Sequence, residues 1–225
     1  MSTAQEVVER RSGGILAAGA LAEGFCSIGA VVLSIIGLTG RFSMLLLAIS
    51  TIAIGAALLF EGGAVTARFS NMLSLARVPA DLSQLGLGMA TEFVAGLAGI
   101  ALGVLALIGI QSLTLVPAAI IIFGGGLLLG VNSAARMSTI MAQMTEQREA
   151  VREVMREAVF SAAGVQLLVG IGVITLGILA LIRINPLMLS LVATLSLGFA
   201  SLMSGTVVIS RVAVAARRHR AGATV

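Results

Sequence analysis

Six long apolar stretches, grouped in three pairs, constrain this chain more than any other feature. They run from Ile15 to Leu38, Phe42 to Val65, Leu85 to Ile110, Leu113 to Val131, Val159 to Ile182 and Leu187 to Ser210. A helix needs about 20 apolar residues to cross a hydrocarbon core about 30 Å thick. The composition agrees, because 58% of the residues are hydrophobic and only 11% are charged. The sequence therefore predicts an all-α fold, a polytopic bundle of six transmembrane helices in a single membrane domain, residues 1–225.

The arginines are distributed unevenly across the predicted topology. Arg41 and Arg183 fall on one side of the membrane, and all the other arginines fall on the opposite side. Arginine-rich loops stay in the cytoplasm, so we expect both termini to be cytoplasmic. The formal net charge of +4 also favours contact of the protein with anionic lipid headgroups. We expect no nucleic-acid partner, because the chain has no Trp or Tyr on which bases could stack.

Each pair of apolar stretches forms a predicted hairpin, and the three hairpins, residues 15–68, 85–136 and 159–211, have the pattern of internal repeats. The segments that align ahead of the turns are Ile35 to Leu38, Leu107 to Ile110 and Leu181 to Ile184. Each repeat contains an even number of spans, so all three share one orientation. The sequence therefore predicts a pseudo-threefold axis along the membrane normal.

The remaining segments are expected at the cytoplasmic surface. Residues 1–12 predict a short surface turn, residues 69–84 a linker, and residues 212–225 a basic tail. Residues 133–158 carry apolar side chains at helical spacing and paired opposite charges on the other face, which predicts a cytoplasmic amphipathic helix.

Three acids inside the predicted spans are the candidate functional residues: Glu23, Glu61 and Glu92. A charged side chain at mid-membrane costs about 2.5–3.5 kcal/mol on insertion scales, so such groups usually have a function or a partner. Gln166 aligns with Glu92 in the repeat. Because these residues lie on faces rich in Gly, Ala and Ser, we expect the first, third and fifth helices to meet near the axis and bring Glu23, Glu92 and Gln166 together.

Arg68, Arg136 and Arg211 align at the cytoplasmic ends of the return helices and are candidate interface charges. Glu61 lies two turns from Arg68 on one face of the second predicted helix. The third repeat has Ser204 where the first has Glu61, so a site built from these positions is asymmetric.

The intramembrane acids have three interpretations. Protonated Glu side chains can hold helices together by hydrogen bonds, or the acids can form a proton-sensitive pathway or a cation site that faces the cytoplasm. The third interpretation is that they bind a partner protein within the membrane. An enzyme is not expected. The single His, His219, lies in the basic tail and the single Cys, Cys26, lies in a span, so no metal, cofactor or nucleophilic site is predicted.

The segment from Leu176 to Pro186 (LGILALIRINP), followed by an apolar return helix with Gly198 and Gly205, resembles the short repeat of the HdeD-type acid-resistance membrane family. Val104 to Ile110 is similar to the same unit. The resemblance implies a six-span, three-hairpin protein of the bacterial inner membrane linked to acid or envelope stress. It carries no established catalytic residues.

Three classes of function follow from the sequence. The first is a non-enzymatic inner-membrane protein, related to acid or envelope stress by the resemblance. The second is a small proton-sensitive transporter or channel that uses the intramembrane Glu residues. The third is an accessory or scaffold subunit, since the small-residue faces and residues 133–158 suit a homo-oligomer or a larger membrane complex as well as the lipid bilayer.

Overall fold

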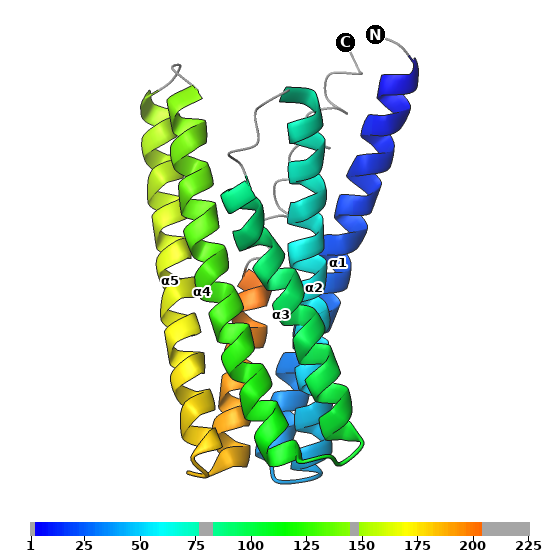
Figure 1. The fold of residues 1–225 in the computed structure, drawn as a ribbon, viewed down its shortest axis with the longest axis vertical. Coiled ribbons are helices and arrows are strands. Elements are labelled where there is room, and N and C mark those ends of the chain that lie inside the picture. The colour runs from blue at the N-terminus through cyan, green and yellow to red at the C-terminus, as the bar shows by residue number, and fades with distance from the viewer. Residues whose placement is uncertain (1–2, 77–82, 145–148, 204–225) are drawn as a thin grey trace.

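The structure is a computed structural model that describes the backbone of residues 3–76, 83–144 and 149–203, and side chains within residues 21–63, 91–130 and 164–203. The described chain is helical and reverses direction at three tight turns (Figure 1). The helices are α1 (Thr3–Leu38), α2 (Ser43–Ala76), α3 (Ser83–Leu107), α4 (Ser112–Met144), α5 (Glu149–Leu181) and a C-terminal helix over Pro186–Met203.

Five of these helices are long and apolar enough to cross a membrane. Their apolar stretches are Leu21–Leu38, Ser43–Gly63, Ser112–Gly130, Gly164–Leu181 and Pro186–Met203. The prediction of a multi-pass helical membrane protein is therefore confirmed for five of the six spans. The remaining helix, α3, has 25 residues, and the part of it whose side chains the structure describes is the apolar stretch Thr91–Leu107.

The helices extend further from the turns than the predicted spans do. α1 begins at Thr3, where a separate surface turn was expected, and α2 continues to Ala76 into the expected linker. Residues 133–144 continue α4, and residues 149–158 begin α5. The charged segment is thus divided between the ends of two helices, in place of one separate amphipathic helix. The basic tail, residues 212–225, lies outside the described residues.

The three turns follow one backbone path. The first positive-φ residue in each turn is Gly40 (87°), Gly109 (92°) or Arg183 (73°), and the second is Phe42 (56°), Gln111 (39°) or Asn185 (46°). In each turn the N–H of the first of these residues donates a hydrogen bond to a carbonyl oxygen three residues earlier, of Gly37, Ala106 or Ala180. Glycine adopts positive φ without a steric penalty, whereas Arg183 and the second residues carry a Cβ there.

The first two turns are also closed by a side chain. The Ser43 hydroxyl donates to the Gly37 carbonyl oxygen, and the Ser112 hydroxyl donates to the Ala106 carbonyl oxygen. The turns place Gly40, Gly109 and Arg183 in equivalent positions. When the first two hairpins are aligned by their turns, Leu38 corresponds to Leu107. The alignment made from sequence, which matched Ile35 with Leu107, is therefore displaced by three residues, about one helical turn.

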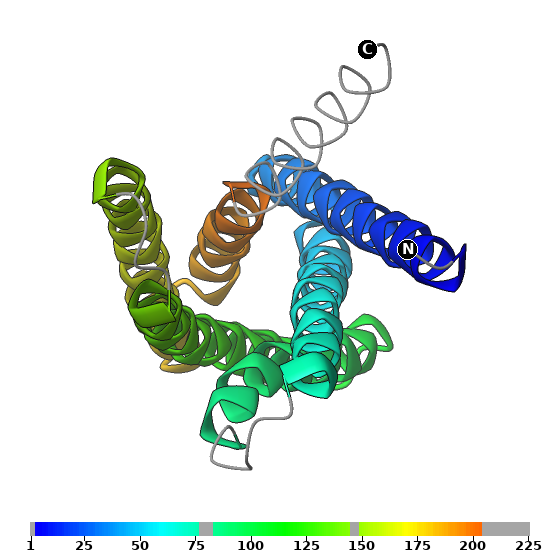
Figure 2. The same cartoon turned by 90° about the horizontal axis from the view of Figure 1, so that it is seen from above.

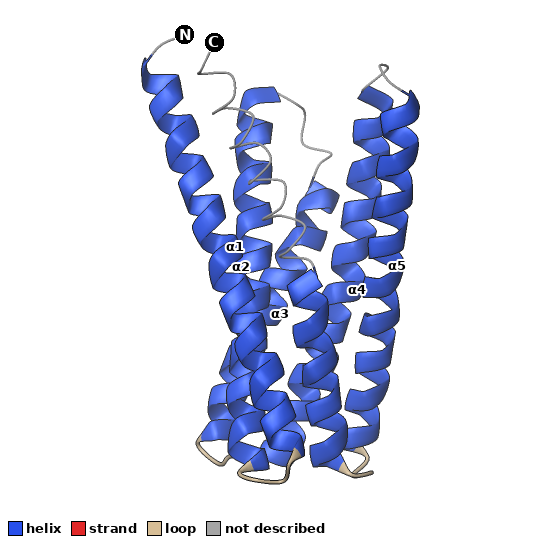
Figure 3. Ribbon diagram, turned by 180° about the vertical axis from the view of Figure 1, so that it is seen from behind, coloured by secondary structure: helices blue, strands red, loops and turns tan. Residues whose placement is uncertain are grey.

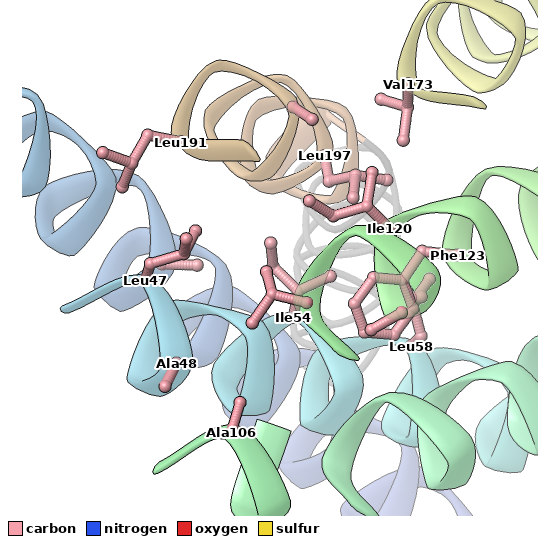
Figure 4. Close-up of a cluster of buried hydrophobic side chains, with 14 of the residues drawn as sticks. Leu47, Ala48, Ile54, Leu58, Ala106, Ile120, Phe123, Val173, Leu191 and Leu197 are labelled. Atoms are coloured by element: carbon pink, nitrogen blue, oxygen red, sulfur yellow. The ribbon is translucent and has the colours of Figure 1, made fainter. Parts of the chain in front are cut away.

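The centre of the bundle is made by α2, α4 and the C-terminal helix, which we call the inner helices. In their apolar stretches 44% of residues are buried, against 28% in α1 and 22% in α5. Figure 4 shows Ile54 from α2, Ile120 and Phe123 from α4, and Leu197 from the C-terminal helix converging in the core, and all four are buried.

The outer helices, α1, α3 and α5, do not meet. Among the labelled helices the pairs in contact are α1 with α2, α2 with α3, α3 with α4, α4 with α5, and α2 with α4. The expectation that the first, third and fifth helices meet near the axis is therefore wrong. Their small-residue faces are buried, but against inner helices.

The C-terminal helix lies next to α1, so the bundle closes into a ring around its core (Figure 2). The hydroxyl oxygens of Ser34 on α1 and Thr194 on the C-terminal helix lie 2.9 Å apart and share a hydrogen bond. The helices are closest together at the end with the three turns and spread apart toward the opposite end, as Figures 1 and 3 show.

An inner helix packs against the outer helix of another hairpin at three seams, and glycine allows close approach at each. A methyl group added at Gly55 on α2 would lie 2.9 Å from the Gly96 carbonyl oxygen on α3. At Gly124 on α4 it would lie 2.9 Å from the Gly170 carbonyl oxygen on α5, and at Gly198 3.3 Å from the Ser27 carbonyl oxygen on α1. Counted from the turns, these three contacts occupy equivalent positions.

Candidate functional site

The three intramembrane acids come from three consecutive helices, Glu23 from α1, Glu61 from α2 and Glu92 from α3. Glu23 is 5% exposed, Glu92 is 9% exposed, and Glu61 is partly buried. Glu61 interacts electrostatically with both Glu23 and Glu92, and Glu23 also interacts with Glu92. The structure thus brings these side chains into one set, which we call the acid group.

Glu61 joins the acid group because α2 is an inner helix that contacts both α1 and α3. It lies about one turn beyond the buried Leu58 of the core. The sequence placed Glu61 with Arg68 on one face of its helix and did not predict its approach to Glu92. The helical spacing of α2 could have predicted this approach, because Glu61 lies about one turn after Leu58 and two turns after Ile54, both of which are core residues.

Gly130 on α4 faces the Glu92 side chain. A methyl group added there would lie 2.7 Å from the carboxyl carbon of Glu92 and would collide with its Oε1 atom. One turn away, a methyl group at Gly126 would lie 2.8 Å from the Cβ of Ala95. The absence of side chains at these two glycines makes room for Glu92 between α3 and α4. Sequence analysis missed Gly130, although it stands at the position equivalent to Glu61.

Glu23 and Ser27 lie one turn apart on α1 and are both buried. Among the described side chains, neither Glu23 Oε1 nor Ser27 Oγ has a hydrogen-bond partner. Burying a polar atom without a partner is costly, so such atoms usually contact a water molecule, an ion or a side chain that moves.

Gln166 is separated from the acid group. It is partly buried on α5, which packs against α4 and contacts neither α1 nor α3. The expectation that Gln166 lies close to Glu23 and Glu92 is wrong, because the inner helices separate the outer ones. The turn register does place Glu23, Glu92 and Gln166 at equivalent positions in the three hairpins.

The three candidate interface arginines cannot be assigned contacts. Arg68 and Arg136 belong to α2 and α4, but their side chains lie outside the described set, and Arg211 lies outside the described residues. Within the described side chains, the charged residues other than the acid group are Arg41 and Arg183, both exposed at the turn end.

The acid group lacks the geometry of a metal site. Within the described part of the chain, no group of three or more His, Cys, Asp or Glu side chains is placed to hold a metal ion. The interaction that the structure shows among the three carboxyls is electrostatic.

Comparisons of this chain with protein-family models, with curated proteins and with solved structures find no match.

Proposed function

We propose that the chain is a non-enzymatic integral protein of a bacterial inner membrane that takes up protons at the acid group. Glu23, Glu61 and Glu92 are held together by α1, α2 and α3 in an apolar bundle. Like charges repel strongly where water is scarce, so each proton bound removes a repulsive interaction. The protonation of the three carboxyls and the packing of the three helices are therefore coupled.

The architecture we propose around this site is three repeated hairpins related by a pseudo-threefold axis, with both termini in the cytoplasm. It is supported by the shared path of the turns at Gly40, Gly109 and Arg183 and by the equivalent glycine contacts of the three seams. The arginine distribution supports the orientation. A role in acid or envelope stress, implied by the HdeD-type resemblance, fits a protein that binds protons inside the membrane.

Infrared spectroscopy of the protein in lipid nanodiscs tests proton uptake. The carbonyl stretch of protonated carboxyl groups is followed during a pH titration of wild type, Glu23→Gln, Glu61→Gln and Glu92→Gln. We expect each substitution to remove part of the band and to shift the titration midpoint of the remaining carboxyls, because the three charges interact. Glu157→Gln, in the charged first part of α5, is the control and should leave that midpoint unchanged. Midpoints that stay fixed in all variants would contradict a coupled acid group.

A small proton-sensitive transporter is the second candidate, favoured by the same three carboxyls. A continuous pore through the centre of the bundle is disfavoured, because the buried side chains of Ile54, Phe123 and Leu197 pack there. A pH jump across proteoliposomes separates the candidates. We expect coupled titration without steady proton flux. Steady flux that disappears in Glu23→Gln and Glu92→Gln would establish the transporter instead.

A further inference from the structure

The core between the turns and the acid group is packed level by level. Aligned on the three turns, the inner helices place equivalent residues at each level. Four successive levels are buried in all three inner helices: Leu47, Val116 and Ser190; Thr51, Ile120 and Thr194; Ile54, Phe123 and Leu197; and Leu58, Leu127 and Ser201. Figure 4 shows Ile54, Phe123 and Leu197 converging at the third level. Protein side chains therefore separate the turns from the acid group along the centre of the bundle.

The seams between the hairpins are closed near the turns as well. At each seam, a side chain of the neighbouring inner helix fills the space beside a glycine of an outer helix. A methyl group added to that glycine would lie 2.6 to 2.7 Å from the neighbour, in the pairs Gly103 with Ile52, Gly177 with Ile121, and Gly37 with Leu191. Neither the centre nor the seams thus leave a route from the turns to the acid group.

The acid group lies where this packed core ends. At the level after Leu58, α2 and α4 carry Glu61 and Gly130, a carboxyl group and a residue without a side chain. Glu61 lies about 27 Å from Ser43, the first residue of α2, at about 1.5 Å per residue. The hydrocarbon core of a bilayer is about 30 Å thick. With the turns at one membrane surface, the acid group therefore lies near the opposite surface.

The helices continue past the acid group and diverge. α1 begins at Thr3, α2 ends at Ala76 and α4 ends at Met144, so each of them extends about 20 Å or more beyond the acid group. Figures 1 and 3 show these helix ends spread apart, whereas the turns lie close together. We call this end of the bundle the open end. A path for water from the open end to the acid group crosses none of the four packed levels.

Two polar atoms near this end of the core point to water there. Glu23 Oε1 and Ser27 Oγ lie one turn apart on α1 and are buried without a hydrogen-bond partner among the described side chains. Ser190 Oγ is also without such a partner, but it lies at the level nearest the turns. Buried water typically bonds to atoms of this kind. Water at Glu23 and Ser27 is therefore expected to be continuous with the open end and separate from Ser190.

The charged groups around the acid group come from few elements. α1, α2 and α3 each contribute one carboxyl, and α4 contributes the uncharged Gly130. The apolar stretches of α5 and of the C-terminal helix, Gly164–Leu181 and Pro186–Met203, contain no charged residue. Arg68 follows Glu61 on α2, about two turns closer to the open end. The charges along α2 beyond the packed core thus lie toward the open end.

We propose that the acid group exchanges protons with water from the open end of the bundle only. The packed levels and the closed seams separate it from the turn end. In the orientation that the arginine distribution favours, the open end faces the cytoplasm. The three carboxyls then respond to cytoplasmic pH and not to the pH outside. This inference rests on the proposed proton uptake and assigns a side to the same site.

An acid jump on one side of proteoliposomes tests this assignment. In a Cys26→Ala background, Phe42→Cys and, in a separate variant, Ile108→Cys place a thiol on an exposed turn. A membrane-impermeant thiol reagent added outside then counts the molecules whose turns face outward, in a preparation reconstituted with one orientation in excess. The outer solution is acidified while trapped buffer holds the inner pH, and infrared spectra follow the protonated-carboxyl band that Glu23→Gln removes. We expect the responding fraction of this band to equal the fraction of molecules whose turn thiol is protected.

An acid jump on both sides, made with a proton ionophore present, gives the full amplitude of the band and separates this inference from the proposed function. A band that does not respond even to this jump would overturn proton uptake and the inference together. A full response to the two-sided jump, with a one-sided response that follows the labelled fraction or is independent of orientation, would overturn the inference alone. The two turn markers should report the same orientation.

Discussion

The inner and outer helices of this bundle have similar hydropathy in their apolar stretches but pack by different means. The inner helices fill the centre with large side chains such as Ile54, Phe123 and Leu197, each almost fully buried. The outer helices present glycine and other small residues to the inner ones and direct large side chains such as Phe25 and Leu168 outward, 75% and 74% exposed. Lipid tails are as apolar as leucine, so hydrophobicity does not decide which helix lies inside. Close fit decides it.

The largest expected effect comes from removing an inner aromatic ring. Phe123→Ala should lower the free energy of unfolding by about 3–5 kcal/mol, the usual cost of truncating a buried aromatic side chain. Phe25→Ala, the matched change on the outward face of α1, should change it by less than about 0.5 kcal/mol. Equilibrium unfolding in mixed micelles measures both. Equal losses in the two variants would remove the distinction between inner and outer helices.

A smaller effect is expected where an outer helix touches the backbone of an inner one. A methyl group at Gly96 would lie 2.6 Å from the Gly55 carbonyl oxygen and 2.8 Å from the Leu59 nitrogen. Gly96→Ala must therefore push α3 from α2 and should cost about 1–3 kcal/mol. Gly172 on α5 has open space around it, so Gly172→Ala is the control and should be neutral or slightly stabilising. A neutral Gly96→Ala in the same unfolding assay would mean that the seam is looser than described.

The smallest expected effect on stability concerns the contact between Gly130 on the inner helix α4 and Glu92 on the outer helix α3. Gly130→Ala should displace the Glu92 carboxyl and lower stability by about 1 kcal/mol, while Gly125→Ala, with open space on the same helix, should not. The cost should disappear when Glu92 is also replaced by Ala, because the colliding atoms are then gone. A double-mutant cycle measures this coupling. A cost that persists without the Glu92 carboxyl would assign the role of Gly130 to helix packing alone.

The helices and turns could be predicted from the sequence, because span length and turn residues are local properties. The predicted first span ends at Leu38, as α1 does, and the turn residues Thr39 to Arg41 connect it to α2. Five of the six spans are confirmed. Away from the turns, α1, α2, α4 and α5 are longer than the predicted spans, because the charged residues that flank the apolar stretches continue the helices.

The arrangement of the helices could not be predicted. A face rich in small residues indicates close packing but does not identify the helix that packs against it. From sequence, Gly96 and Gly103 of α3 could therefore contact an outer helix as well as α2. The choice depends on which helix carries the side chains that fill the centre, and Phe123 has no local signature of that role. Because the neighbouring helices could not be identified from sequence, neither the approach of Glu61 to Glu92 nor the space that Gly130 leaves for Glu92 could be predicted.

The ring closes between α1 and the C-terminal helix, which are the first and the last of the described helices to be synthesised. Until the C-terminal helix arrives, Ser34 lacks its partner Thr194, Ser27 lacks Gly198 beside it, and Ile54 and Phe123 lack Leu197. The order of synthesis therefore leaves a polar, incompletely packed intermediate in the membrane. A chain truncated before residue 186 would therefore keep this edge of α1 open, with the Ser34 hydroxyl lacking its partner on Thr194.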